Sequence, residues 1–301
     1  MHDSLELWER PAPKELYMIA GWRQWADAGS ISSELPLYVT EKTGARAIGR
    51  IRPDGYYLFQ VPGTHHLFRP EIKLKDGHRQ SLEVRKNEIH YAEIDDKGLV
   101  VFLGDEPQLN VDGYAGAFFD IASELGVKRI VALGGVYGPV PHDRDRQVSC
   151  VYSLPGLKPE LKNYSLEFSN YEGGATIGSY LSDAAEQRGI EYLVLNAFVP
   201  MYDLSQLSSD LRTIMIERDY RAWYDLLERL NYMFKFGLDL QDLGIKSREL
   251  TAQVAEQIDV LARKMPQIEI KQFVEKLTED FEEKPFAPLD DVWERGLDDI
   301  L

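Results

Sequence analysis

The chain has 301 residues, of which 44% are hydrophobic and 28% charged, and this composition is typical of a folded globular protein with a sizeable core. Its 34 Lys and Arg residues against 50 Asp and Glu residues give a net charge of −16, which argues against binding to nucleic acid or to an anionic membrane surface. The only cysteine, Cys150, excludes an intramolecular disulfide and any metal site that needs several cysteines.

The sequence predicts a cytoplasmic protein. The N-terminal residues lack the basic stretch and the apolar run of a signal peptide. No stretch approaches the roughly 18 consecutive apolar residues that indicate a membrane-spanning helix. A single cysteine is also compatible with a reducing compartment.

Short apolar runs alternate with helical patterns over the first two thirds of the chain. A helix is predicted at residues 30–42. Residues 73–91 alternate around Asp76 and Gly77, which predicts a hairpin at a sheet edge. Strands are predicted by three apolar runs, at residues 16–20, 45–51 and 57–61.

The clearest unit is a strand, a helix and a second strand in the middle of the chain. The two strands, Leu99–Leu103 and Arg129–Leu133, are almost continuously apolar. A further helix at residues 177–188 leads into an apolar strand at 192–197. Apolar strands joined by helices indicate a parallel sheet that is covered on both faces, so we predict an α/β domain over residues 1–205.

The last third of the chain is predicted to be helical. Apolar positions mark a long helix from about residue 210, and two further apolar stripes follow at 250–265 and 270–281. Each stripe must be buried against the α/β core, another helix or another subunit. We assign residues 206–301 to a helical extension with an acidic tail, because residues 279–301 contain nine Asp and Glu against one Lys and one Arg. We expect the last 20 or so residues to be solvated or to face a basic partner.

Binding sites in parallel α/β sheets gather in the loops beyond the carboxyl ends of the strands. Four such loops, which begin at Gly21, Gly104, Gly134 and Phe198, are expected to share one rim. No catalytic residue is assigned. The candidate residues for a ligand or partner are Trp22, Asp27, Gly104, Glu106, Gly134, Gly135, His142, Arg144, Tyr171, Glu172 and Tyr202.

Each acidic or basic candidate could take part in catalysis or ligand binding, or could only stabilise the fold. Glu106 could form an acid/base pair with Asp105 or could cap a helix. His142 and Arg144 could orient an anion or could belong to a salt-bridged turn. For each set we favour the structural interpretation.

The glycine and tryptophan candidates have the same two interpretations. Gly134 and Gly135 could approach a phosphate or could allow close packing. Trp22 could contact a ligand or partner, but packing in the core is the interpretation we favour.

No cofactor and no metal are predicted. The sequence contains no spaced-glycine dinucleotide fingerprint, no phosphate-binding Gly-Lys-Ser/Thr loop, no Gly-x-Ser-x-Gly and no His-Glu-x-x-His. His65 and His66 are neighbours without a third ligand at a clear spacing. Cys150 lies in a strand-like segment, and we expect a buried structural residue rather than a nucleophile.

Six short motifs in order along the chain resemble the proteasome assembly chaperone 2 family. They are Gly21-Trp22 with Ala26-Asp27-Ala28-Gly29, Gly104-Asp105-Glu106-Pro107, Leu133-Gly134-Gly135, Pro141-His142-Asp143-Arg144, Tyr171-Glu172-Gly173 and Val199-Pro200-Met201-Tyr202. The helical tail also resembles the extension of bacterial and archaeal members. The sequence departs from the family pattern by two residues inserted before Asp27 and by Met201, where a histidine is common.

The resemblance implies a fold and a mode of action. The implied fold is a three-layer α/β/α core with a mixed, mostly parallel central sheet, like that of nucleoside phosphorylases, followed by an all-helical C-terminal extension. The resemblance also implies self-association or pairing with a related subunit. Eukaryotic members of the family help to assemble proteasome α-rings.

Two functions are compatible with the sequence. The first, which we favour, is a non-catalytic assembly chaperone or scaffold that acts as a homo-oligomer, for which a trimer is a reasonable stoichiometry, with a protein partner. The second is a small-molecule-binding protein or an enzyme, similar to a nucleoside phosphorylase or hydrolase, with its site at the rim. In the second, Arg144 would bind an anion and Glu106 or His142 would move a proton.

Overall fold

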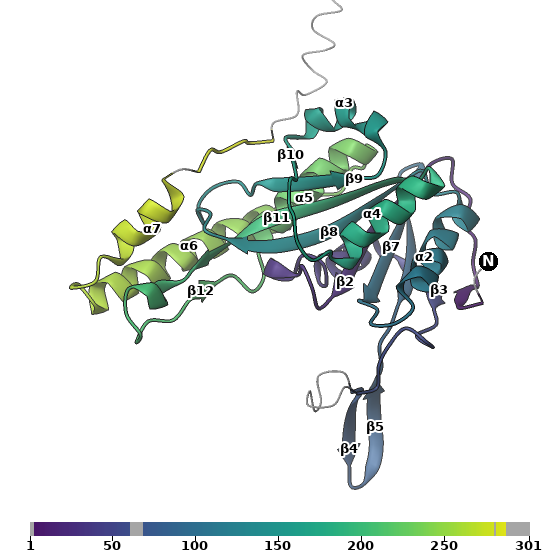
Figure 1. Cartoon of the computed structure of the whole chain (residues 1–301), viewed down its shortest axis with the longest axis horizontal. Helices are drawn as coiled ribbons and strands as arrows, with labels where there is room; N and C mark the ends of the chain where they lie inside the picture. The colour runs from purple at the N-terminus through teal and green to yellow at the C-terminus, as the bar shows by residue number, and fades with distance from the viewer. Residues whose placement is uncertain (1–2, 61–68, 280, 287–301) are drawn as a thin grey trace, which may run out of the picture.

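The computed structural model describes residues 3–60, 69–279 and 281–286, and a mixed β-sheet lies at its centre (Figure 1). The middle of the sheet consists of four parallel strands in the order β7 (Lys97–Asp105), β2 (Leu16–Arg23), β8 (Arg129–Gly138) and β11 (Glu191–Tyr202). Antiparallel strands extend the sheet beyond β7, in the order β6 (Glu88–Ile94), β3 (Arg46–Ile51) and β1 (Leu5–Leu7). Beyond β11 lie β9 (Val148–Tyr152), which is antiparallel to it, and β10 (Glu167–Phe168).

Helices cover both faces of the sheet, and the predicted α/β fold is confirmed. Neighbouring residues of one strand face opposite layers: Met18 belongs to the apolar cluster under one set of helices and Ile19 to the cluster under the other. This burial on both faces is why the parallel strands read as continuous apolar runs. The helices are α2 (Val111–Leu125) and α4 (Ile177–Arg188) on one face, and α1 (Leu35–Thr43) and α5 (Tyr220–Phe234) on the other. The short helix α3 (Lys158–Leu161) follows β9.

The C-terminal helices α6 (Gln241–Lys264) and α7 (Ile270–Thr278) carry the predicted apolar stripes, and they bury these stripes within the same chain. Val254 and Ile258 of α6 and Val274 of α7 belong to the apolar cluster that contains α5 and the sheet. Of the possibilities that the sequence left open, burial against the core and a neighbouring helix of the same chain is the one found, so the stripes are no argument for oligomerisation. The boundary between residues 205 and 206 stays a prediction. None of the described helices is both long and apolar enough to cross a membrane.

The segment 281–286 lies along the body of the protein, with residues 282–285 exposed and Phe286 buried. Glu283 accepts hydrogen bonds from the loop that follows β8. Phe286 is only 8% exposed, and the Arg229 guanidinium lies 5.1 Å from the centre of its ring. Because residues 282–285 are exposed, only Phe286 is anchored by burial in this segment, and residues 287–301 lie outside the described part of the chain. The predicted acidic tail stays a prediction.

Two helices begin later than the apolar spacing predicted. Residues 28–30 form a short 3-10 helix and residues 31–34 form turns before α1, because the Asp27 carboxylate accepts hydrogen bonds from two backbone N–H groups of this segment at 2.8 and 2.9 Å. Helix α5 begins at Tyr220 because Asp219 caps it, accepting from two backbone N–H groups of the first turn at 3.1 Å. Residues Ile214–Met215, which were expected in this helix, form the short strand β12 against β11.

The predicted hairpin forms around Asp76 and Gly77, but it is not at an edge of the main sheet. Strands β4 (Glu71–Lys75) and β5 (His78–Glu83) form a two-stranded sheet of their own. This sheet projects from the body of the molecule (Figure 1). The last residues of the predicted segment form β6, which joins the main sheet.

The strand predicted at residues 57–61 is wrong for residues 57–60, which are irregular, and Val61 lies outside the described residues. The Tyr57 hydroxyl lies 2.7 Å from Asn87 Oδ1 and 2.8 Å from the backbone carbonyl oxygen of Asp105. Tyr57 is thus held by its side chain at the end of β7 and not by strand pairing.

Candidate functional site

The strands that form the predicted rim extend further than their apolar runs. Strand β7 continues to Asp105, β8 to Gly138 and β11 to Tyr202. Glycines that we interpreted as the start of loops are therefore strand residues. The candidates that lie in strands are Trp22, Gly104, Gly134, Gly135 and Tyr202.

Gly134 and Gly135 are points of close approach inside β8. A Cβ atom at Gly135 would lie 2.0 Å from the carbonyl oxygen of Ala28, and one at Gly134 would lie 2.1 Å from Asn196 Oδ1. The backbone N–H of Gly135 donates to the carbonyl of Ala26 at 2.7 Å, so the loop after β2 lies directly on β8. Neither glycine is at a helix N-terminus or a turn, which was the geometry that a phosphate site required.

Asp27 lies in the same contact between the β2 loop and β8. It forms an isolated bridge with Gly135, and its carboxylate holds the turn before α1. Burial raises the pKa of Asp27, and its hydrogen bonds from Ser32 and Ser33 act in the opposite direction. These contacts give Asp27 a positioning role in this loop.

Trp22 and Gly104 border a buried polar network. Trp22 Nε1 donates to the Tyr114 hydroxyl at 2.9 Å, and this hydroxyl lies 3.1 Å from Asn87 Oδ1. A Cβ atom at Gly104 would lie 2.7 Å from the Tyr114 oxygen and 2.8 Å from Asn87 Oδ1, so only glycine leaves room for the network. Trp22 is 2% exposed and packs in the core, which leaves it no surface to offer a partner.

Asp105 and Glu106 have separate partners. The buried Asp105 carboxylate accepts hydrogen bonds from the backbone N–H of Lys86 at 2.8 Å and from Arg85 at 3.0 Å. Glu106 Oε1 accepts from the backbone N–H of Ile177 at 3.1 Å, where the N-terminus of α4 favours a negative charge. Burial raises the pKa of Glu106, although this N–H partly offsets the effect. The contact of Glu106 with the start of α4 has the geometry of the helix-capping alternative.

His142 and Tyr202 meet where β11 ends. His142 Nδ1 lies 3.1 Å from the Tyr202 hydroxyl, and this hydroxyl donates to the carbonyl of Val140 at 3.0 Å. Burial lowers the pKa of His142 and raises the pKa of Tyr202. Arg144 is exposed instead and pairs with Glu283 at 3.4 Å, so the two candidates for anion binding have different partners.

Tyr171 and Glu172 lie in an exposed loop before α4. Tyr171 is 74% exposed, and its hydroxyl donates to the carbonyl of Gly174 at 3.4 Å. The structure distributes the candidates over several separate contacts, of which Asp27 with Gly135 and His142 with Tyr202 are two.

A buried charged cluster under the loop after β8 was not found by sequence reasoning. Arg146 Nε donates to Asp219 Oδ2 at 2.7 Å, and both side chains are at most 1% exposed. The same guanidinium donates to the carbonyls of Pro141 at 3.0 Å and Arg144 at 2.7 Å. The loop is thus wrapped around one buried cation.

Asp225 and Arg229 extend this cluster along α5. The backbone N–H of Arg146 donates to Asp225 Oδ2 at 2.7 Å, and Arg229 Nε donates to the carbonyl of Tyr164 at 3.0 Å. Burial raises the pKa of Asp225 to about 6 and lowers the pKa of Arg229. Asp225 and Arg229, four residues apart on an otherwise apolar helix face, are the sequence signal by which this cluster could have been found.

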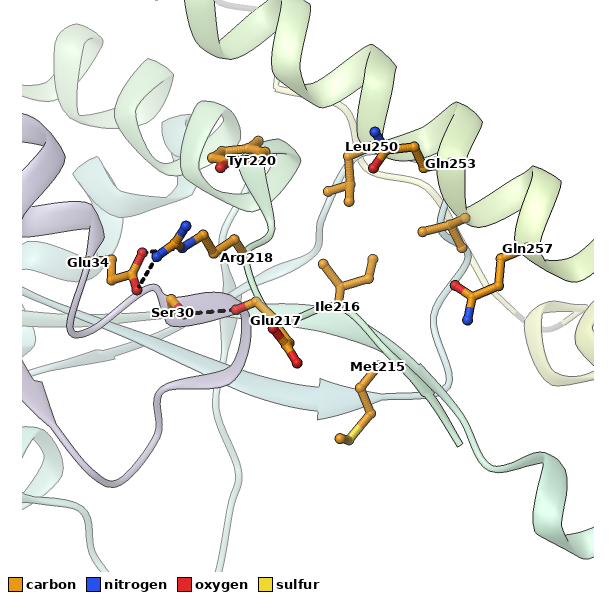
Figure 2. Close-up of a pocket in the computed structure, with 11 residues that line it drawn as sticks. Ser30, Glu34, Met215, Ile216, Glu217, Arg218, Tyr220, Leu250, Gln253 and Gln257 are labelled. Atoms are coloured by element: carbon orange, nitrogen blue, oxygen red, sulfur yellow. Dashed lines mark hydrogen bonds and ion pairs between the residues drawn. The ribbon is translucent and has the colours of Figure 1, made fainter. Parts of the chain in front are cut away.

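A groove of about 540 Å³ lies between α6 and the segment 214–220 (Figure 2). Ile216 and Val254 are buried in it, and Met215 is 52% exposed. The remaining residues that line it are Ser30, Glu34, Glu217, Arg218, Tyr220, Leu250, Gln253 and Gln257. The lining contains none of the sequence-predicted candidates, so this surface was not foreseen.

Within residues 3–60, 69–279 and 281–286, no three His, Cys, Asp or Glu residues are gathered as metal ligands. His65 and His66 lie outside the described residues. Cys150 is 1% exposed, and burial raises the pKa of its thiol to about 12, as expected of a structural cysteine.

The motifs at this rim agree with a comparison against family models, in which the PAC2 family matches residues 21–258. The chain belongs to the PAC2 family. A PAC2 family protein from Streptomyces avermitilis has a similar structure, with a TM-score of 0.69 and 25% identity over 86% of this chain and 100% of that one. The suspected family and the fold are both confirmed.

Two further structures show the same fold as this PAC2 chain. A proteasome-assembly chaperone homologue of Mycobacterium tuberculosis is 22% identical, with a TM-score of 0.68, over 80% of this chain and 94% of that one. Pyrococcus furiosus PbaB, an archaeal proteasome activator, is 18% identical, with a TM-score of 0.59, over 85% of this chain and 98% of that one. No curated protein sequence matches the PAC2 chain significantly.

Proposed function

We propose that this PAC2 chain is a non-catalytic, cytoplasmic assembly chaperone or scaffold that acts as a homo-oligomer on protein subunits. Membership of the family supports a chaperone-like role, and structurally similar proteins include a proteasome-assembly chaperone homologue and a proteasome activator. One observation supports the absence of catalysis in this proposal: the candidate acids and bases make hydrogen bonds that hold the fold together. Glu106 caps α4, His142 contacts Tyr202 and Asp27 holds a turn.

The enzyme alternative has less support. A catalytic site needs an acid, a base and an anion-binding group that converge on one reacting atom. Glu106 faces α4, His142 faces Tyr202, and Arg144 reaches the segment 281–286. The residues named for this function therefore have separate partners.

The test is the assembly of proteasome α- and β-subunits from the source organism, followed on native gels with and without the purified PAC2 chain. We expect stoichiometric amounts of the chain to increase the fraction of α-subunits in rings, without any added nucleotide or metabolite. Unchanged assembly, or a source genome without proteasome subunits, would overturn the proteasome form of this proposal.

A variant of Glu106 tests whether the assembly effect needs a catalytic carboxylate. Glu106→Gln keeps an oxygen that can accept the hydrogen bond of Ile177, so this variant is expected to fold and to assist assembly as the wild type does. Loss of the effect in a Glu106→Gln protein with an unchanged thermal midpoint would show that the carboxylate has a chemical role.

A further inference from the structure

A second groove, of about 450 Å³, lies between α5 and the first turns of α6, and we call it the α5–α6 groove. It is lined by Tyr224 of α5 and by Leu240, Gln241, Gly244, Ile245 and Arg248 at the start of α6. Gly244 leaves its centre open, because a Cβ atom there would have Arg248 at 3.7 Å and Tyr224 at 3.8 Å as its nearest neighbours. Ile245 is 50% exposed, so the groove offers apolar surface to a ligand.

The charge of the α5–α6 groove is opposite to that of the protein. Arg248 is the one charged residue in the described lining, whereas the whole chain carries −16. This arginine is exposed and makes no ion pair with any residue that the structure describes. The groove therefore fits a ligand in which apolar side chains stand beside carboxylates.

The residues that follow Phe286 have this chemistry. Residues 287–301 contain five Asp and Glu against one Arg. Their large apolar residues recur at spacings of three and four, which is typical of a helix with one apolar face. These residues are Leu289, Val292, Trp293, Leu297, Ile300 and Leu301.

Phe286 brings this segment of the chain to α5. Its ring centre lies 5.1 Å from the Arg229 guanidinium and 5.7 Å from the ring centre of Tyr232. Figure 1 shows the preceding residues passing from α7 toward α3. The residues that come next along the chain therefore start beside the C-terminal half of α5.

The α5–α6 groove is within reach of Phe286. Tyr224 precedes Tyr232 by two spacings of four residues, which places both on one side of α5. The rise between them is about 12 Å, since a helix rises about 1.5 Å per residue. An extended chain spans about 3.3 Å per residue, so about four residues beyond Phe286 cover this distance. Val292 and Trp293 can thus enter the groove of their own chain.

We propose that residues 287–301 dock in the α5–α6 groove of their own chain, with apolar side chains over Gly244 and Ile245 and acidic side chains beside Arg248. The short connection to Phe286 gives the segment a high effective concentration at this groove. A second copy is disfavoured as the source of the segment, because two chains of charge −16 repel each other. Any partner that binds the groove then competes with this segment.

The larger groove beside α6 is a poorer site for the same segment (Figure 2). Its two other charged residues, Glu34 and Arg218, are paired with each other. Glu217 in its lining makes no ion pair with any residue of the described ranges, and it repels an acidic segment.

The test measures amide hydrogen exchange of the purified full chain by mass spectrometry, with a synthetic peptide of residues 287–301 as the reference. A docked helix keeps its N–H groups hydrogen-bonded, so residues 289–301 are expected to exchange about tenfold more slowly in the chain than in the peptide. The groove variant is Ile245→Asp with Arg248→Glu. Both positions are exposed, so the thermal midpoint is expected to stay that of the wild type, while the segment exchanges as fast as the peptide.

Met215→Asp with Arg263→Glu is the matched control. It makes the same change in net charge at two exposed positions outside the α5–α6 groove. The segment is expected to exchange as slowly in this variant as in the wild type.

Three outcomes would overturn the proposal. Exchange in the wild type as fast as in the peptide would show that the segment is not docked. Slow exchange that persists in the groove variant would show that it docks on another surface. Slow exchange that becomes fast on dilution would show that the groove belongs to a second copy. None of these outcomes depends on whether proteasome subunits respond to the chain.

Discussion

Arg146 and Asp219 form an ion pair of 2.7 Å whose two side chains are at most 1% exposed. The pair joins the loop after β8 to the residue that caps α5, across 73 positions of the chain. The helical part of the protein is thus connected to the rim of the sheet by a buried charge pair as well as by apolar packing. The rim loop depends on this pair, because the guanidinium also binds its backbone carbonyls.

Arg146→Met is expected to lower the free energy of unfolding by about 3–5 kcal/mol, because it leaves the Asp219 carboxylate buried without a counter-charge. Arg146→Met with Asp219→Asn should lose less than the sum of the two single variants, since the unpaired charge is absent. Urea unfolding measures both. Arg144→Met, at an exposed position, is the control and should change stability by less than about 0.5 kcal/mol. A stable Arg146→Met protein would show that the pair contributes little.

Gly135→Ala is expected to destabilise the protein by about 1–3 kcal/mol, because the new Cβ forces the β2 loop away from β8. That Cβ would lie 2.0 Å from the Ala28 carbonyl oxygen. Gly156→Ala is the matched control, since a Cβ there has no neighbour within 4 Å. Thermal or urea unfolding compares the two. If Gly135→Ala and Gly156→Ala were equally stable, the β2 loop would move away from β8 without a loss of folding free energy.

His142 should make the stability of the protein depend on pH. Burial lowers its pKa below the ordinary value of 6.5, so the unfolded state binds the proton more readily between the two values. The contribution of the neutral imidazole is complete above 6.5 and is lost as the pH falls through the lower, folded pKa. The thermal midpoint of the wild type minus that of His142→Asn is therefore expected to be larger at about pH 7.5 than at about pH 5. The same difference at both pH values would contradict this assignment.

The α/β fold was predictable because its strands and helices are periodic along the chain. Leu99–Leu103 and Arg129–Leu133 were recognised as parallel strands from local composition. The ends of these strands were not recognised, because Gly104 and Gly134 resemble turn residues. In the structure they instead make room for side chains of Tyr114 and Asn196 from distant segments.

The candidate site was predictable only as a set of rim residues. Motif order placed Asp27, Glu106 and His142 near the same edge of the sheet, but the partner of each is set by packing. Glu106 became a helix cap because α4 begins beside it. No pattern within a few residues of Glu106 contains that information.

The sequence by itself determined the family, the α/β class, the helical C-terminal part and the excess of negative charge. These properties depend on composition and on spacings between near neighbours. The tertiary structure alone decided that Arg146 meets Asp219, that the apolar stripes of α6 and α7 are covered within the chain, and that α5 and α6 form a groove between them. Burial and charge pairing join residues far apart in sequence, and local patterns do not encode which of them meet.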